Sequence, residues 1–272
     1  MASFHRRFML LALPALAGCA SVAGSAPAAA DVYSGKSVLD AAIQAAGGET
    51  ALATVKELGW TGAATINADG KTTEVEMSTV VRPFTYARST SWPTDKTPVQ
   101  GRTVQAQFGN AWTVSRVVWT PMPEAEAEYE NQQFSLYSVM LLAPLKDAAV
   151  KVEETAPGKD GTRNLHVEHP EAPPMDLRFN ASGKLVRAAY SVRNPKGGAP
   201  IAQVAEFSGE MTSNGVKWPK RISISQNGAP WMDLQLATFE ARPEITVRPL
   251  EHTLEVPGQA TPQGRPGDEN AG

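Results

Sequence analysis

The feature that most constrains the fold is a period-two alternation of apolar and polar residues over much of residues 58–238. This is the pattern of β-strands with one buried face. About ten such segments can be counted, separated by turn residues. Asn67-Ala68-Asp69-Gly70 and Asn227-Gly228 are the clearest hairpin signals. If these strands formed a flat sheet, the apolar face of the sheet would expose a large apolar surface to water. We therefore expect a mostly β (α+β) fold with a single curled antiparallel sheet.

Helical periodicity is confined to two parts of the chain, which are expected to plug the mouth of this sheet. Ser37 can cap a first helix that stops at Gly47-Gly48, and a short helix is expected over residues 49–56. The long pattern runs from Pro123 to Leu142, with glutamates at its start. Its apolar stripe predicts a lid or plug helix and consists of Phe134, Tyr137, Met140 and Leu141.

Charge and cysteine content exclude several functional classes. The 272 residues carry 25 Lys and Arg against 28 Asp and Glu, a net charge of −3. This balance offers no basic surplus for a nucleic acid. A single cysteine excludes an intramolecular disulfide and a zinc site built from cysteines. Neither a P-loop nor a dinucleotide fingerprint occurs, so we expect no cofactor.

The N-terminus has the pattern of a signal peptide. Arg6 and Arg7 precede an apolar stretch, residues 8–17, which is too short to span about 30 Å of hydrocarbon. The stretch ends in Leu16-Ala17-Gly18-Cys19, which resembles the lipobox of bacterial lipoproteins. That resemblance implies removal of residues 1–18 and lipid attachment at Cys19. The alternative is cleavage after Ala30, which would leave a soluble periplasmic protein.

The lipobox interpretation predicts a membrane anchor and a domain order. Ala20 after the cysteine favours the periplasmic face of the outer membrane, by resemblance to Gram-negative sorting rules. Two or three acyl chains would anchor the protein stably. Residues 19–36 are rich in small residues and are expected to form a flexible tether. Residues 37–256 are expected to fold, and residues 257–272 to be disordered.

Two segments of the expected domain resemble the lipoprotein-localisation (LolA/LolB-like) superfamily. The first is Ala46-Gly47-Gly48-Glu49-Thr50-Ala51-Leu52-Ala53-Thr54-Val55-Lys56-Glu57-Leu58, followed by Trp60-Thr61-Gly62. The second is Gly215-Val216-Lys217-Trp218-Pro219-Lys220-Arg221-Ile222. The resemblance covers about residues 37–246. It implies an incomplete antiparallel β-barrel with helices in its opening, and an apolar cavity that takes a lipid or the acyl chains of a lipoprotein.

Strand parity predicts which side chains would line such a cavity, although a slip of one residue would turn a whole strand's set outward. The expected wall residues are Trp60, Ile66, Met77, Phe108, Leu177, Ile222 and Leu234. Trp218 is expected in the core or the wall, and the barrel rim is expected to carry Trp92, Trp119 and Trp231.

The sequence offers little sign of catalysis. His166, Glu168 and His169 form the one tight cluster of histidine and acid, and a polar strand face is the favoured interpretation over a metal site. A Gly-x-Ser-x-Gly elbow is absent from the sequence. We expect a lipid-binding envelope protein and not an enzyme. The alternative is a structural or sensor lipoprotein that uses the same fold to bind another envelope protein.

The anchor can be tested directly. The chain should incorporate labelled palmitate in a Gram-negative host, and Cys19→Ser should abolish the incorporation, because no other thiol can accept the lipid. Retention of the label in Cys19→Ser, or cleavage after Ala30 in the wild type, would contradict the lipobox interpretation.

Overall fold

The computed structural model describes residues 35–115, 118–158 and 160–246. These belong to one compact unit and are rich in strand, with 51% strand and 18% helix. The expected signal peptide, Cys19, nearly all of the expected tether and the expected C-terminal tail lie outside the described residues. No helix in the described ranges combines the length and apolarity needed to cross a membrane.

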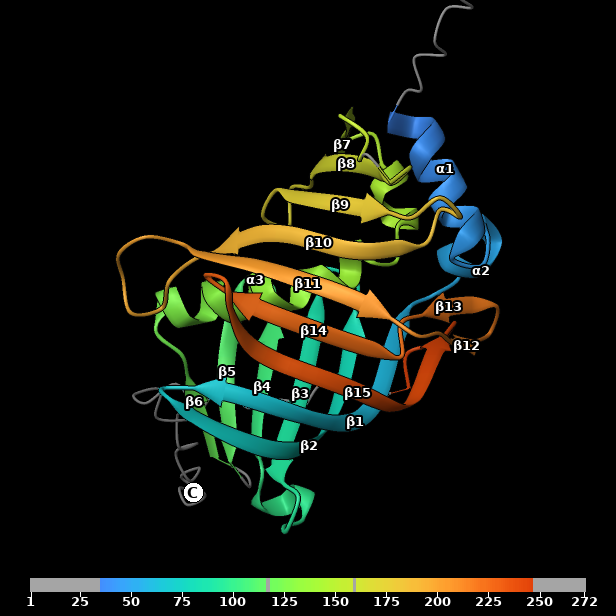
Figure 1. The fold of residues 1–272 in the computed structure, drawn as a ribbon. Coiled ribbons are helices and arrows are strands. Elements are labelled where there is room, and N and C mark those ends of the chain that lie inside the picture. Colours follow the sequence, from blue (N-terminus) through green and yellow to red (C-terminus); the bar gives the residue numbers. More distant parts are fainter. Residues whose placement is uncertain (1–34, 116–117, 159, 247–272) are drawn as a thin grey trace, which may run out of the picture. The chain divides into compact units, whose positions relative to one another are not determined.

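Thirteen strands form one antiparallel sheet in the order β6-β5-β4-β3-β2-β1-β15-β14-β11-β10-β9-β8-β7 (Figure 1). The first half of the chain supplies β1 (Glu57–Ala68), β2 (Lys71–Arg82), β3 (Tyr86–Pro93), β4 (Arg102–Gln107), β5 (Asn110–Ser115) and β6 (Val118–Pro121). The second half supplies β7 (Lys151–Thr155), β8 (Arg163–Glu168), β9 (Met175–Phe179), β10 (Leu185–Val192), β11 (Ile201–Ser208), β14 (Arg221–Gln226) and β15 (Ala229–Arg242). A separate hairpin pairs β12 (Met211–Ser213) with β13 (Val216–Trp218).

The first and last strands join these halves at the centre of the sheet. Strand β1 pairs with β15 from Glu57 opposite Arg242 to Ile66 opposite Met232, with a register shift between Thr61 and Gly62. A Cβ atom at Gly62 would lie 2.3 Å from the carbonyl oxygen of Gln235, closer than real Cβ contacts. Glycine therefore permits the close approach of the two backbones at this irregularity.

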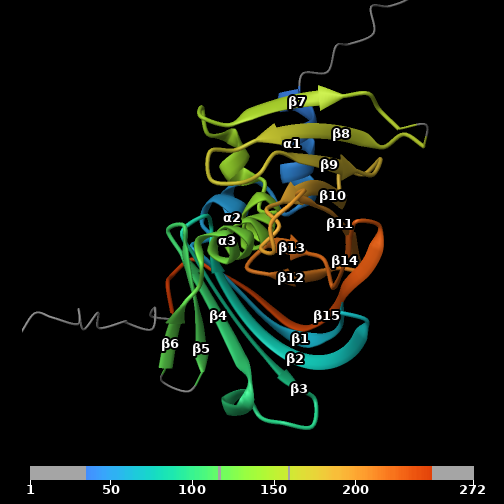
Figure 2. The ribbon, with the colours of Figure 1, turned by 90° about the vertical axis from the view of Figure 1, so that its left-hand side faces the viewer.

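The sheet stays open, because β6 and β7 end the strand order without pairing to each other. The helices are α1 (Gly35–Ala45), α2 (Glu49–Ala53) and α3 (Glu124–Val139), with short 3₁₀ turns η1 (Pro98–Gln100) and η2 (Ala143–Lys146). Helix α1 packs against β7 and β8, whereas α3 lies between the two arms of the curved sheet and contacts β2, β4, β5 and β10 (Figure 2). The expected incomplete barrel with helices in its opening is therefore confirmed.

Positive φ angles mark the expected hairpins. Asn227 and Gly228 have φ of 48° and 81°, and Asp69 and Gly70 have φ of 50° and 72°. Both pairs have the left-handed conformation that a two-residue type I′ turn requires. These two hairpins lie where the sequence placed them.

The two segments that carry the family resemblance contact each other. The backbone N–H of Lys217 donates to the carbonyl oxygen of Ala46 at 2.8 Å. A Cβ atom at Gly47, whose φ is 126°, would lie only 2.0 Å from the carbonyl oxygen of Gly215. Only glycine combines this φ with so close an approach. The Gly-Gly break after α1 therefore serves to dock the β12–β13 hairpin.

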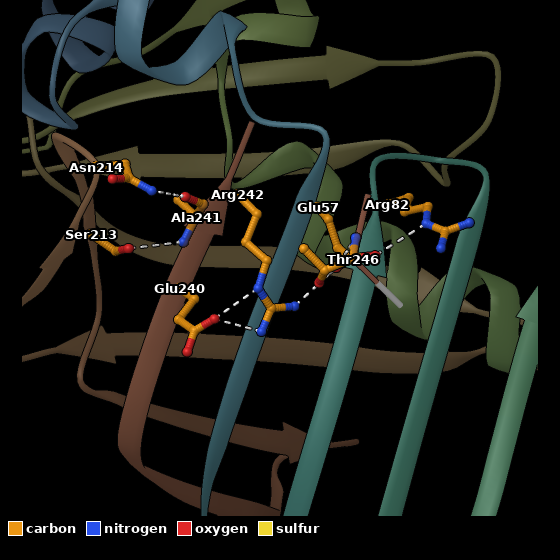
Figure 3. Close-up of polar contacts among 8 residues, drawn as sticks. All are labelled: Glu57, Arg82, Ser213, Asn214, Glu240, Ala241, Arg242 and Thr246. Carbon is orange, nitrogen blue, oxygen red and sulfur yellow. Dashed lines mark hydrogen bonds and ion pairs between the residues drawn. The ribbon is translucent and has the colours of Figure 1, made fainter. Parts of the chain in front are cut away.

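A buried carboxylate on β1 links this strand to its two neighbours at the centre of the sheet. Glu57 on β1 is fully buried and accepts hydrogen bonds from Arg82 on β2 at 3.3 Å, from Arg242 on β15 at 2.9 Å and from the Thr246 hydroxyl at 2.8 Å (Figure 3). The same row of polar contacts continues to the β12–β13 hairpin, where Ser213 and Asn214 bond the backbone of Ala241. One ionised side chain thus ties β2, β1 and β15 together.

The environment of Glu57 fixes its charge. Burial alone would raise the pKa of this carboxyl group. The hydrogen bonds from Thr246, Arg242 and Arg82 outweigh burial, so the pKa lies below its ordinary value of 4.5. A folded-state pKa below the unfolded value stabilises the fold above that unfolded value, and this stabilisation is lost as the pH falls through the folded-state pKa.

Glu57→Gln should lower the free energy of unfolding by about 2–4 kcal/mol at neutral pH, because it removes the buried carboxylate that the two partly buried guanidinium groups of Arg82 and Arg242 share. The deficit should shrink as the pH falls below 4.5, where the wild type loses the same interaction. Urea unfolding over this pH range measures both effects.

Asp233→Asn is the matched control for this prediction. Asp233 binds Arg221 in an ion pair in which both side chains are about half exposed. Its loss should cost at most about 1 kcal/mol. Equal costs for the two variants would contradict a special role of Glu57.

Candidate ligand-binding site

Helix α3 occupies the space between the two arms of the sheet and is the centre of the candidate site. Glu124 and Glu126 lie in its first turn, where the helix dipole favours acids. In its second half, the side chains from Ser135 to Val139 are buried without interruption. The single apolar stripe expected from the sequence is therefore too simple, because this half of the helix is enclosed on all sides.

The first half of α3 is attached to both arms by polar contacts. Toward β10, Glu128 forms an ion pair with Arg193, and the Gln132 side chain accepts a hydrogen bond from the Arg193 backbone at 2.6 Å. Toward β5, Asn131 donates to the carbonyl oxygen of Asn110 at 3.2 Å. Such exposed contacts contribute little each. The first half of α3 is thus held less firmly than the buried second half.

A row of polar side chains on α3 faces the inner surface of β10, β11 and β14. We call the following group the interior polar cluster: Tyr129, Gln133, Tyr190, Gln203 and Gln226. Gln203 lies directly opposite Tyr190 on β10 and Gln226 on β14. The Gln226 amide donates to the Tyr129 hydroxyl at 3.0 Å, and Gln133 follows Tyr129 by one helical turn.

Aromatic rings extend this group across the interior. Tyr137, two turns after Tyr129, lies 4.7 Å from Trp60 between ring centroids, and Trp60 lies 6.4 Å from Trp218. Trp218 stacks on Phe239 at 5.2 Å. Trp60 and Trp218 are therefore buried in the core. Trp92, Trp119 and Trp231 are half-buried and lie within strands β3, β6 and β15.

The interior keeps its tyrosines neutral. Burial raises the pKa of Tyr137 to about 12 and that of Tyr190 well above its ordinary value. Burial likewise raises the pKa of Tyr129. The pKa of Glu130 is also raised, first by burial and then by the neighbouring Glu126, while Arg102 acts in the opposite direction. Charged groups are thus disfavoured in this part of the molecule.

Several polar atoms in this interior have no hydrogen-bond partner. Within the described residues these include both amide atoms of Gln203, the hydroxyl of Tyr190 and the amide nitrogen of Gln133. The indole nitrogens of Trp60 and Trp218 are in the same state. A buried polar group without a partner costs about 1–3 kcal/mol. The interior polar cluster therefore has unused capacity to bind a polar group or water.

A pocket of about 320 Å³ opens beside the second half of α3. Its size is at the lower end of the range for small-molecule sites, about 300–1,000 Å³. It is lined by the β2–β3 turn, α3 and residues 170–173, and its lining includes Phe84, Phe134, Ser135 and Ser138. The Ser138 hydroxyl accepts the Phe84 backbone N–H at 2.9 Å, which supports the left-handed φ of 57° at Phe84.

His169 is not a lining residue of this pocket, but it contacts the lining residue Phe84. Its ring stacks on Phe84 with centroids 3.8 Å apart, and burial lowers its pKa. His166 and Glu168 share a strand face as expected, and His166 Nδ1 lies 2.8 Å from Asp176. In the described ranges no three side chains of His, Cys, Asp or Glu group closely enough to hold a metal ion.

The expected wall residues mostly lie in the core. Leu177, Ile222 and Leu234 are fully buried, Trp60 and Met77 nearly so, and Ile66 is half-buried against them. None of the seven lines the pocket beside α3. Their inward direction agrees with strand parity, whereas their contact with a ligand remains a prediction.

Phe108 was placed wrongly. It is 70% exposed, because Phe108 and Gly109, with φ of 47° and 79°, form the turn between β4 and β5. Gln107 pairs with Asn110 across this turn. Gly109-Asn110 resembles a turn placed one residue later, whereas the turn observed requires an unusual left-handed phenylalanine.

The interior polar cluster was missed at the sequence level. Tyr129, Gln133 and Tyr137 are spaced four residues apart, so they lie on one face of the helix. This spacing could have revealed a polar and aromatic stripe.

The fold, an open antiparallel sheet curved around a helix, can be compared with the folds of known proteins. No protein-family model matches the chain, and no curated protein matches its sequence. Among solved structures, a LolA superfamily protein from Nitrosomonas europaea aligns with a TM-score of 0.50 at 10% identity, over 77% of this chain and 94% of that one.

Two further structures align at slightly lower scores. One is a domain from Vibrio parahaemolyticus that is described as an outer membrane lipoprotein-sorting protein domain. It gives a TM-score of 0.49 at 9% identity, over 75% of this chain and 92% of that one. A DUF1329 family protein from Desulfovibrio piger gives 0.49 at 12% identity, over 78% and 94%. At such identities the likeness concerns the fold. The chain has a LolA-like fold, which confirms the predicted resemblance at that level.

The attachment of α3 can be probed by hydrogen exchange. Arg193→Ala removes the ion pair to Glu128 and should speed amide exchange in residues 124–132, while residues 136–139 keep their protection. Lys196→Ala is the control, because Lys196 pairs with the exposed Asp69 and not with α3. Uniform acceleration along α3 would contradict the division into two halves.

Proposed function

We propose that this protein is a lipid-binding component of the bacterial cell envelope that holds acyl chains against the inner face of its curved sheet. The carrying observation is the LolA-like fold with α3 lying between the two arms. The first half of α3 is attached to both arms largely through exposed polar contacts, so its movement would disrupt little apolar packing beyond that of Ala127 and Tyr129. Its movement would give an acyl chain access to the interior.

The apolar residues next to α3 suit such a ligand. Trp60 and Met77 are buried side chains of the sheet, and Tyr137 of α3 packs against Trp60. The pocket beside α3 is a second apolar surface next to this helix, with Phe134 and Phe84 in its lining. Burial of apolar chains here would supply most of the binding free energy, at roughly 25 cal/mol per Å². Non-covalent binding is proposed, without a catalytic step.

The proposed location follows from the N-terminus. Lipid attached to Cys19 would hold the domain at the periplasmic face of the outer membrane, with residues 19–36 as the tether. Cleavage after Ala30 would give a soluble periplasmic form with the same binding domain. The ligand is a lipid or the acyl chains of a lipoprotein, and transfer between partners is a further step that this proposal does not include.

A second candidate function is binding of another envelope protein. This alternative is favoured by the dense packing of Leu177, Ile222 and Leu234, which leaves no space for an acyl chain beside these three side chains. Under this alternative the interior is a plain core, and the partner binds the outside of the domain.

Native mass spectrometry of the full chain carrying Cys19→Ser distinguishes the two functions, since this variant cannot be acylated itself. A co-purifying species that organic solvent extracts as a lipid supports the proposed function. A ligand-free protein that also fails to take up added dioleoylglycerol contradicts it and favours the protein-binding alternative.

A further inference from the structure

The interior polar cluster has a donor pattern that points to one kind of ligand group. The unpartnered amide nitrogens of Gln203 and Gln133 each carry two N–H donors, and the unpartnered hydroxyl of Tyr190 adds one more donor. The unpartnered acceptors are fewer: the amide oxygen of Gln203 and the hydroxyl oxygen of Tyr190. The unused capacity of the cluster is therefore mostly for donating hydrogen bonds.

These groups lie together and not scattered through the core. Gln203 and Tyr190 are directly opposite each other on β11 and β10. Gln133 lies one helical turn after Tyr129, whose hydroxyl accepts a hydrogen bond from Gln226, the other cross-strand neighbour of Gln203. Gln203 is 1% exposed and Tyr190 is 6% exposed, so bulk solvent does not satisfy them in the closed structure.

We infer that the interior polar cluster is a binding site for the ester carbonyls of an acyl lipid. An ester carbonyl accepts hydrogen bonds and offers none, which complements a group of donors. The ester of a lipid also lies at the start of its acyl chains, so a carbonyl at Gln203 leaves the chains among Tyr137, Trp60 and Trp218. This inference rests on the proposed function and names its ligand class.

The electrostatics of the site disfavour a free fatty acid. The titratable side chains that face the cluster are Tyr129, Tyr137 and Tyr190, all neutral, together with Glu130. A carboxylate ligand would be buried beside Glu130 and without a cation in the cluster. Burial of an unpaired charge is far more costly than burial of a neutral ester. The site thus selects esterified over free acyl chains.

The test compares dioleoylglycerol with the matching diether, which has the same chains but no carbonyl groups. Tryptophan fluorescence of the delipidated full chain carrying Cys19→Ser reports binding, since Trp60 and Trp218 lie in the interior. The diester should bind at least about tenfold more tightly than the diether, the value of one good hydrogen bond. Oleate should bind more weakly than the diester.

Gln203→Leu should abolish this preference by weakening the diester and not the diether. Tyr190→Phe, which removes only a hydroxyl, should reduce the preference and guards against a folding defect in the first variant. Ser191→Ala, on the exposed face of β10, should leave the preference unchanged. With a labelled carbonyl, the infrared stretch of the bound diester should lie at lower frequency than that of the free diester, and Gln203→Leu should remove the shift.

The outcomes separate the two proposals. Equal, tight binding of diester and diether would overturn the ester site and leave lipid binding standing, with internal water as the partner of these donors. A preference that survives Gln203→Leu and Tyr190→Phe would also overturn it. Failure of both lipids to bind would overturn the proposed function itself.

Discussion

The pairing of β1 with β15 is the interaction on which the rest of the structure depends. It joins an arm built from the first half of the chain to an arm built from the second half. Glu57 holds this pair from β1, with an arginine on each neighbouring strand. Gly62 lets the two backbones approach at the irregular register. Without this pair the space that contains α3 would have no continuous wall.

The polarity of the interior follows from what fills it. A helix enclosed by a sheet is expected to be apolar on all sides. Helix α3 instead carries Gln133, Ser135 and Ser138 among its buried side chains. Ser138 uses its hydroxyl to support the β2–β3 turn, whereas Gln133 faces a cluster whose donors lack partners. The polar residues of one helix thus serve two purposes, one structural and one proposed to be functional.

The sequence predicted the fold class better than the site. Alternation identified the strands, and Asn227-Gly228 marked its hairpin because those residue types tolerate left-handed angles. The turn at Phe108 escaped prediction because phenylalanine rarely adopts such angles. The pairing of Glu57 with Arg242 was beyond any local pattern, since the two residues lie 185 positions apart. The interior polar cluster likewise depends on strand order, which alternation does not encode.

The same separation has a consequence for how the protein matures. Contacts between residues so far apart form late and slowly, because a long loop must close first. Until β15 arrives, β1 presents an unpaired edge with Leu58 and Trp60 uncovered, which is the kind of surface that drives aggregation. A chain synthesised from its N-terminus therefore cannot complete its sheet until nearly all of it has emerged. A chaperone that binds unfolded chains would have to protect β1 from aggregation until β15 pairs with it.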